Sequence, residues 1–320
     1  MMVICIIDNI IRNTDKQVLR IFIWKEMKEA FIKLHIAVLI AGSTGLFGKL
    51  ITLGEFPLTF YRVTFAAIMF WIFMTFTGKV HRLPFRQMLR MGGVGLLLAL
   101  HWAFFYGSIK YSNISIGVVC FSLVGFFTAI FEPIILRRQL SLKELLFSLL
   151  TVLGILLIFH FDSHYRFGIV LGIISSALNS LFTITNKMTS AKTGHSASTI
   201  LLYAMTGGAI GMMVLLPFFV GAFPEVRLLP TMVDLLWLLA LSSVSTLLLY
   251  LLQIQTLKVI SAFTVSLTFN LEPIYSIIMA MLFFGEAKQL GLSFYAGLFL
   301  IFLSVALQTF SVARDTKKRR

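Results

Sequence analysis

Residues 262–284 read AFTVSLTFNLEPIYSIIMAMLFF, an apolar run with Glu272 and Pro273 near its middle. The run is long enough for a transmembrane helix, which needs about 20 apolar residues. A carboxylate near the centre of a bilayer is costly and is usually retained for a function. Proline interrupts the helical hydrogen-bond ladder and frees the carbonyl one turn back, at Phe269. The pair predicts a chain that handles a polar cargo inside a membrane.

The composition extends this prediction to the whole chain. Hydrophobic residues make up 58% of the 320 residues, charged residues make up 12%, and the mean hydropathy is +0.94. A soluble domain is about half apolar and about a quarter charged. We therefore expect an all-α polytopic membrane protein. The net charge of +14 comes from short basic groups between apolar segments, which argues against a nucleic-acid partner.

No cofactor chemistry is expected. Cys5 and Cys120 lie far apart in the sequence, so neither a disulfide framework nor a zinc site is indicated. No second histidine or carboxylate stands at metal-ligand spacing from His101. The chain also lacks a G-x-x-x-x-G-K-[ST] loop, which argues against an ATPase. We predict no metal, no cofactor and no enzyme activity.

Ten apolar segments are long enough to cross the hydrocarbon core. They are separated by breaks such as Gly54-Glu55-Phe56-Pro57 and the polar run at 110–113. We place them near 34–53, 58–78, 91–109, 114–136, 142–161, 168–187, 198–220, 233–256, 262–284 and 290–312.

Lysine and arginine predict the orientation, because they are enriched in cytoplasmic segments. With the N-terminus inside, most basic residues fall in inner segments. The outer segments carry only Lys110, Arg166, Arg227 and Lys288. We therefore expect a multi-pass protein of the inner (cytoplasmic) membrane with both termini in the cytoplasm.

The two ends of the chain are basic. Residues 1–33 form an N-terminal extension whose mixed charges and aromatics suit an interfacial helix on the cytoplasmic leaflet. The alternative is translation from Met27, with Lys28 and Lys33 as a sufficient anchor. Residues 313–320 form a basic tail that suits contact with anionic membrane lipids.

The chain overlies itself at a shift of 148 residues. Lys110 then falls on Lys258 and Gly125 on Pro273, so residues 34–161 and 168–312 read as two copies of five helices. An odd number of spans per copy requires the second copy to be inverted in the membrane. Inverted repeats are a recurring architecture of secondary transporters, with substrate sites near the midplane between them.

The second half resembles the second EamA domain of the drug/metabolite transporter superfamily. The resemblance lies in the run LKVISA at 257–262, in Leu271-Glu272-Pro273 and in Gly285-Glu286; Arg62 also matches an arginine common in the first EamA domain. Gly125 stands where the family usually has proline, and Arg138 where it usually has glutamate. The resemblance covers about residues 34–312. It implies a ten-helix carrier of small metabolites, often outward, in the inner membrane.

Glu272 is the leading candidate site residue. A rise of 1.5 Å per residue places it roughly 15 Å into its span, near the midplane of a core about 30 Å thick. There it would bind a cationic or amino group, or carry a coupling proton. The alternative is a bracing role, with hydrogen bonds to Asn270 or a neighbouring serine.

Polar and aromatic residues of three other spans are candidates for the same cavity. His101, Trp102 and Tyr106 would line a wall for an amphiphilic cargo, although aromatics at helical spacing also serve as packing. Asn179 and Tyr250 lie at comparable depth. The small polar residues Ser43, Thr44, Ser175 and Ser176 better suit close contacts between helices.

Three further charges allow two interpretations. Lys49 and Arg62 lie toward the outer ends of their spans, where long basic side chains commonly extend to the interface. We favour that for Lys49 and leave Arg62 open, since it would attract an anion in the cavity. Glu132 lies near the cytoplasmic end of its span, where an interfacial ion pair with Arg137 or Arg138 is expected.

The leading function is a secondary transporter that exports a small polar or amphiphilic metabolite, amino acid-like or drug-like, by alternating access. Protons are the candidate coupling ion, and a homodimer is a further possibility. One alternative is a membrane enzyme acting on lipid-linked substrates, for which Asp162, His164 and Arg166 form the only compact polar group. Another is a non-transporting sensor or scaffold.

Overall fold

The structure, a computed structural model, describes residues 2–137, 139–140, 142–161, 165–257, 268–269 and 271–318. Asn270 and Asp162 are among the residues outside the described part, as are His164, Arg138 and Lys258.

The described part is helical, and two of the predicted apolar runs, 114–136 and 233–256, are each divided between successive helices. The elements are α1 (Met2–Leu50), α2 (Glu55–Phe76), α3 (Phe85–Lys110), α4 (Ile114–Phe121), α5 (Val124–Leu136), α6 (Leu142–Phe161), α7 (Arg166–Thr193), α8 (Ala197–Ala222), α9 (Met232–Ser242), the π-helical η2 (Ser243–Leu248), α10 (Leu249–Leu257), α12 (Glu272–Phe284), the 3₁₀ turn η3 (Glu286–Gln289) and α13 (Leu292–Lys318).

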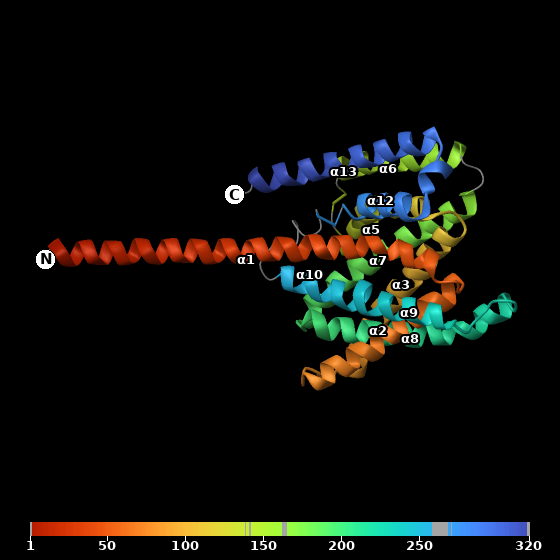
Figure 1. Cartoon of the computed structure of the whole chain (residues 1–320), viewed down its shortest axis with the longest axis horizontal. Helices are drawn as coiled ribbons and strands as arrows, with labels where there is room; N and C mark the ends of the chain where they lie inside the picture. Colours follow the sequence, from red (N-terminus) through yellow and green to blue (C-terminus); the bar gives the residue numbers. More distant parts are fainter. Residues whose placement is uncertain are drawn as a thin grey trace.

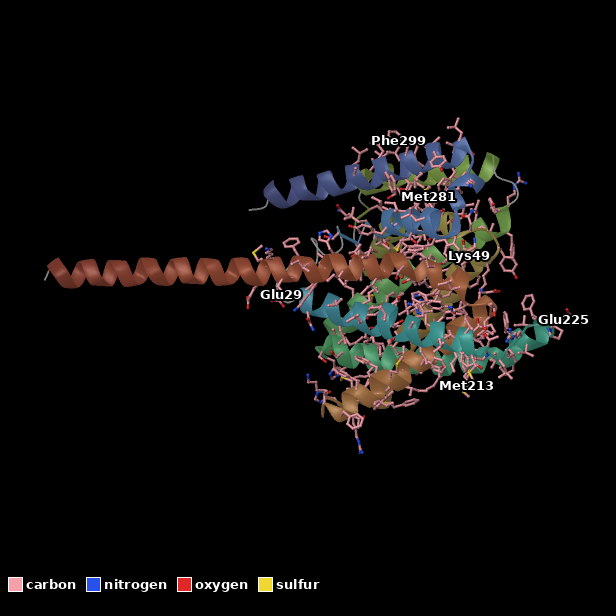
Figure 2. The ribbon with its side chains drawn as sticks, in the orientation of Figure 1. Glu29, Lys49, Met213, Glu225, Met281 and Phe299 are labelled. Atoms are coloured by element: carbon pink, nitrogen blue, oxygen red, sulfur yellow. The ribbon has the colours of Figure 1, made fainter. Side chains whose placement is uncertain are left out.

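Seven helical segments of the described part are long and apolar enough to cross a membrane, and three shorter apolar helices accompany them. Many large apolar side chains face outward, as Met213 and Phe299 do on opposite sides of the bundle in Figure 2. Met213 is 63% exposed and Phe299 is 65% exposed, which suits contact with lipid rather than water. The protein is a multi-pass membrane protein.

Figure 1 shows how the helices are grouped. Helices α6 and α13 pair on one side, α2, α3, α8 and α9 pack on the other, and α1 runs between the two groups beside α12. Both chain ends lie at the same end of the bundle, which we call the terminal end; the opposite end, where α1 stops at Leu50, is the far end.

Two helical breaks are related by the shift of 148 residues. Helices α5 and α12 begin at Val124 and Glu272, and each is 13 residues long. Each ends in a left-handed residue, Arg137 at φ 53° and Gly285 at φ 62°. The two copies therefore share these local bounds, although valine replaces the carboxylate at the equivalent position.

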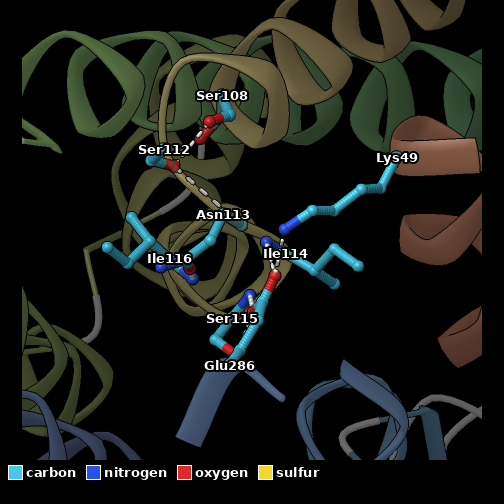
Figure 3. A network of polar contacts seen from close by, with 8 residues as sticks. All are labelled: Lys49, Ser108, Ser112, Asn113, Ile114, Ser115, Ile116 and Glu286. Atoms are coloured by element: carbon cyan, nitrogen blue, oxygen red, sulfur yellow. Dashed lines mark hydrogen bonds and ion pairs between the residues drawn. The ribbon is translucent and has the colours of Figure 1, made fainter. Parts of the chain in front are cut away.

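A buried carboxylate connects helices at the far end, as Figure 3 shows. Glu286 is fully buried and accepts hydrogen bonds from the backbone of Ile114 and Ser115, at 3.0 and 2.9 Å, and from the Ser115 hydroxyl at 2.7 Å. A carboxylate suits this place because the first N–H groups of a helix lack intrahelical partners. Asn113 completes the cap by accepting from the Ile116 backbone.

Lys49 contacts a buried carboxylate, a partner that the sequence did not predict. Its Nζ lies 3.3 Å from Oε1 of Glu286, and its side chain is 37% exposed. The buried carboxylate attracts the ammonium group, and the pair ties α1 to the turn after α12 (Figure 3). A second carboxylate acts nearby: Asp234 caps α9 and accepts from the backbone and hydroxyl of Thr52 at 2.6 and 2.8 Å.

Glu132 forms an ion pair, as expected. Its partner is Lys187, whereas the sequence had suggested Arg137 or Arg138. Its Oε1 lies 2.9 Å from Nζ of Lys187 on α7. Both side chains are partly exposed, at 27% and 63%, so this pair contributes little to stability.

We expect Glu286→Gln to lower the free energy of unfolding by about 2–3 kcal/mol, because charge-assisted hydrogen bonds to two backbone donors are weakened. Denaturant titration in detergent micelles would measure the loss. Glu132→Gln is the matched control, with an expected loss below about 1 kcal/mol. Equal losses for the two variants would contradict the structural role of Glu286.

Arg137→Gly should raise the free energy of unfolding by up to about 1 kcal/mol, because glycine adopts the left-handed conformation without the steric cost borne by arginine. Arg137→Ala is the control: it removes the same charge but keeps a Cβ, so no gain is expected. Thermal unfolding of the three proteins compares them. A gain shared by both variants would point to the charge instead of the backbone.

Candidate functional site

Arg62 lies inside the helix bundle, with 2% of its surface exposed. Its guanidinium stacks on Trp102 of α3, 3.7 Å from the ring centroid, and Nη1 donates to the Tyr106 hydroxyl at 2.7 Å. Stacking suits arginine because its planar cation is weakly hydrated and is attracted to a π face. Arg62 therefore points into the bundle rather than to the membrane interface. The structure brings three predicted site residues together: Arg62, Trp102 and Tyr106.

Arg62 also contacts η2, a π-helical segment. Nε of Arg62 donates to the Thr246 hydroxyl at 3.2 Å, and Nη2 donates to the Ser245 carbonyl at 3.4 Å. The Ser242 hydroxyl in turn donates to the Arg62 carbonyl at 3.0 Å. Short π segments inside helices frequently occur at functional sites. Here the extra residue per turn places Ser245 and Thr246 beside the cation.

Sequence reasoning missed these two residues. The signal was the run SSVST at 242–246, a cluster of hydroxyls inside an otherwise apolar span. Hydroxyl side chains compete with the backbone for hydrogen bonds inside helices. The cluster was therefore a sign of irregular helical geometry.

The guanidinium retains capacity for a further ligand. It has five N–H donors, and the contacts found for it among the described residues are with neutral oxygens and aromatic rings. The Ser245 hydroxyl is buried beside it and has no hydrogen-bond partner in the described part. A buried charge is normally compensated by a counter-ion, so this arrangement suits an anionic group.

Glu272 is near enough to Arg62 for their charges to attract one another. Glu272 is half-buried at the first position of α12, followed by Pro273, whose missing N–H costs nothing there. Across the described residues its carboxylate has no hydrogen bond and no ion pair. Tyr250 is half-buried on α10 and packs against the core that contains Trp102 and Tyr106. A carboxylate and a guanidinium therefore lie within electrostatic range of one another, and no direct ion pair joins them among the described residues.

Close packing of α1 against α12 fixes the position of this carboxylate. A Cβ placed on Gly42 would lie 3.2 Å from both the Glu272 carbonyl and the Ser276 nitrogen, and 3.0 Å from the Tyr275 Cβ. Glycine lets the first turn of α12 approach this closely, whereas a side chain here would push it away by a few tenths of an ångström. The bracing role considered for Glu272 through Asn270 involves a residue outside the described part.

His101 has the contacts of a structural residue. It is 5% exposed, and Nδ1 lies 2.8 Å from the Ser175 hydroxyl and 3.0 Å from the Ser175 carbonyl. Its ring packs beside Phe105 and Phe121. These contacts favour its role in joining α3 to α7 over a place in an open cavity.

The other small polar residues also serve helix packing. Ser176 donates to the Cys120 carbonyl at 2.8 Å across two helices, whereas Ser43 and Thr44 donate to the Ile40 carbonyl of their own helix. Asn179 is half-buried on α7 beside Ser180, whose hydroxyl contacts Thr128 of α5. Asn179 is not among the residues found to contact Arg62 in the described part.

A curated relative and a solved structure match most of the chain. The relative, named "Uncharacterized transporter YxxF" from Bacillus subtilis (strain 168), is 23% identical over 290 residues, covering 88% of this chain and 90% of that protein. A crystal structure titled only "Crystal structure of protein" superposes with a TM-score of 0.58 at 15% identity, over 88% of this chain and 98% of that one. This likeness shows a shared fold.

The family comparison covers both halves of the chain. The model of the EamA-like transporter family matches residues 30–160 and again residues 166–310. These matches include Arg62 and Trp102 in the first segment and Glu272 in the second. The chain belongs to the EamA-like transporter family.

Proposed function

We propose that this protein is a secondary transporter that exports a small zwitterionic metabolite, amino acid-like in its charges. The proposal rests on one observation: Arg62 is buried without a carboxylate at ion-pair distance among the described residues, in the same region as the unpaired carboxylate of Glu272. A cargo with one anionic and one cationic group would satisfy both charges.

The aromatic contacts favour a cargo with an apolar side chain as well. Trp102 and Tyr106 are buried around the guanidinium and Tyr250 is half-buried beside them. Cargo sites in proteins are mostly apolar, with a few polar groups that fix orientation. In this proposal Arg62 and Ser245 bind the anionic group, Glu272 binds the amino group, and the rings contact the remainder.

Alternating access would arise from two five-helix halves, residues 34–161 and 168–312, inserted in opposite directions. The shared bounds of α5 and α12 and the location of both chain ends at one end of the bundle support this arrangement. The basic terminal end would then face the cytoplasm of the inner membrane. Glu272 is also the proposed site of the coupling proton.

We expect Glu272→Gln to abolish the pH dependence of transport while leaving the protein folded, because glutamine keeps the shape but cannot exchange a proton. Counterflow of labelled amino acids into proteoliposomes, at several external pH values, would measure this. Glu225→Gln, in the exposed loop after α8, should behave as the unmodified protein. Unchanged flux and pH response in Glu272→Gln would falsify the assigned role.

Arg62→Gln should weaken cargo binding about 10–100-fold, since a hydrogen bond to a charged group contributes roughly 1.5–3 kcal/mol. Arg62→Lys keeps the charge but loses the planar fork, so an intermediate loss is expected. Thermal shifts of purified protein with amino acids, their amides and their decarboxylated amines would measure binding. Selectivity for the carboxylate should disappear in Arg62→Gln; selectivity that persists would remove Arg62 from the site.

Binding and counterflow measurements on the same reconstituted protein would distinguish a transporter from the membrane enzyme and the sensor considered above. A membrane enzyme would release a product from a lipid-linked substrate without vectorial flux, and a sensor would bind the cargo without moving it. Specific binding with counterflow supports the transporter; binding without counterflow would overturn it.

A further inference from the structure

A cavity of about 280 Å³ lies between the first half of α3 and the end of α7. Its lining combines two basic residues, two threonines and small or apolar residues: Arg90, Gly93, Val94, Leu97, Thr185, Met188, Thr189 and Lys192. None of these residues contacts Arg62 or Glu272 in the site described above. The cavity is therefore a separate feature at the terminal end of the bundle.

The rim of the cavity carries positive charge without a matching carboxylate. Arg90 and Lys192 come from two different helices, and neither has an ion pair or hydrogen bond in the described part of the chain. Lys187, one turn earlier on α7, differs because Glu132 neutralises it at 2.9 Å. The residues that line the cavity contribute cations only.

Helix α3 adds to this positive field. Its first turn contains no acidic residue, and its N-cap, Pro84, provides no side-chain cap. Arg86 lies one turn before Arg90 on the same helix. Cations near a helix N-terminus are unfavourable, and like charges four residues apart repel. An anion at the rim would relieve both effects.

The floor of the cavity is suited to an amphiphile. Val94, Leu97 and Met188 provide an apolar surface. Thr189 also lines the cavity, and it is 3% exposed. On the outer surface of α3, Phe85 is 74% exposed and Leu89 is 66% exposed, as expected for residues that contact lipid chains. The cavity thus presents cations and a hydroxyl above apolar walls, beside a lipid-facing surface.

We propose that this cavity binds the phosphate of an anionic phospholipid in the leaflet at the terminal end of the bundle. Arg90 and Lys192 contact the phosphate oxygens, the Thr189 hydroxyl donates to one of them, and the upper acyl chains lie along Phe85 and Leu89. Basic pockets between membrane helices recognise such headgroups. A free phosphate would share the ionic contacts but would leave the apolar walls unused.

Native mass spectrometry of the purified full chain in neutral detergent tests the proposal, with dioleoyl phosphatidylglycerol and dioleoyl phosphatidylcholine as probes. We expect one phosphatidylglycerol to be retained in preference to phosphatidylcholine. The double variant Arg90→Gln/Lys192→Gln should weaken its retention about 30-fold, from the attraction contributed by each basic residue. Lys79→Gln/Arg82→Gln removes two exposed charges that do not line the cavity and should change retention less than about threefold.

A second variant tests the cavity itself without changing charge. A Cβ placed on Gly93 would have no neighbour within 4 Å, so Gly93→Leu should fill the cavity and reduce retention while the protein stays folded. Gly221→Leu, in an equally open position at the end of α8, is the control.

Three results would overturn the proposal. Equal losses for the two double variants would indicate a diffuse electrostatic effect. Undiminished retention in Gly93→Leu would place the lipid elsewhere. Displacement of the lipid by millimolar inorganic phosphate would identify a free-phosphate site.

Discussion

The burial of Arg62 is the constraint around which the described interior is arranged. A guanidinium in an apolar bundle needs partners in every direction that water would otherwise occupy. Trp102 and Tyr106 of α3 supply a π face and a hydroxyl, and the η2 segment supplies Thr246 and the Ser245 carbonyl. From α2, this one side chain contacts both α3 and η2. The guanidinium retains capacity for a further hydrogen-bonded ligand, and this capacity makes the region suitable for an anion.

Irregular helical segments bring polar groups into the bundle. In a bilayer, irregular backbone is tolerated only where it is buried in protein or lines a polar cavity. The break before α12 presents the Glu272 carboxylate, and the π segment presents Ser245 and Thr246. At the far end, Glu286 satisfies the first N–H groups of α4. The π segment and the turn after α12 thus coincide with polar contacts between helices, whereas the Glu272 carboxylate has none among the described residues.

Helices α5 and α12 are alike in backbone and unlike in chemistry. Helices α5 and α12 share their bounds at a shift of 148 residues, yet Val124 stands at the place of Glu272 and Arg137 at the place of Gly285. One copy therefore supplies the carboxylates at its break and at its end, and the other supplies Arg62. The proposed cargo site is accordingly asymmetric in charge, which suits a cargo with two unlike ends.

The sequence by itself determined the class of the protein, because apolar runs of membrane length follow from composition and order alone. It also singled out Glu272, Arg62 and Gly285-Glu286 through the EamA resemblance, and the family match confirms that membership. The sequence did not predict which side chains pair between helices. The partner of Lys49 is 237 residues away, and Lys187 is 55 residues from Glu132. Only the tertiary structure decided that Arg62 lies inside, that His101 joins two helices and that η2 completes the site. Local sequence sets the length and polarity of each helix, but the direction a polar side chain faces depends on which helix packs beside it.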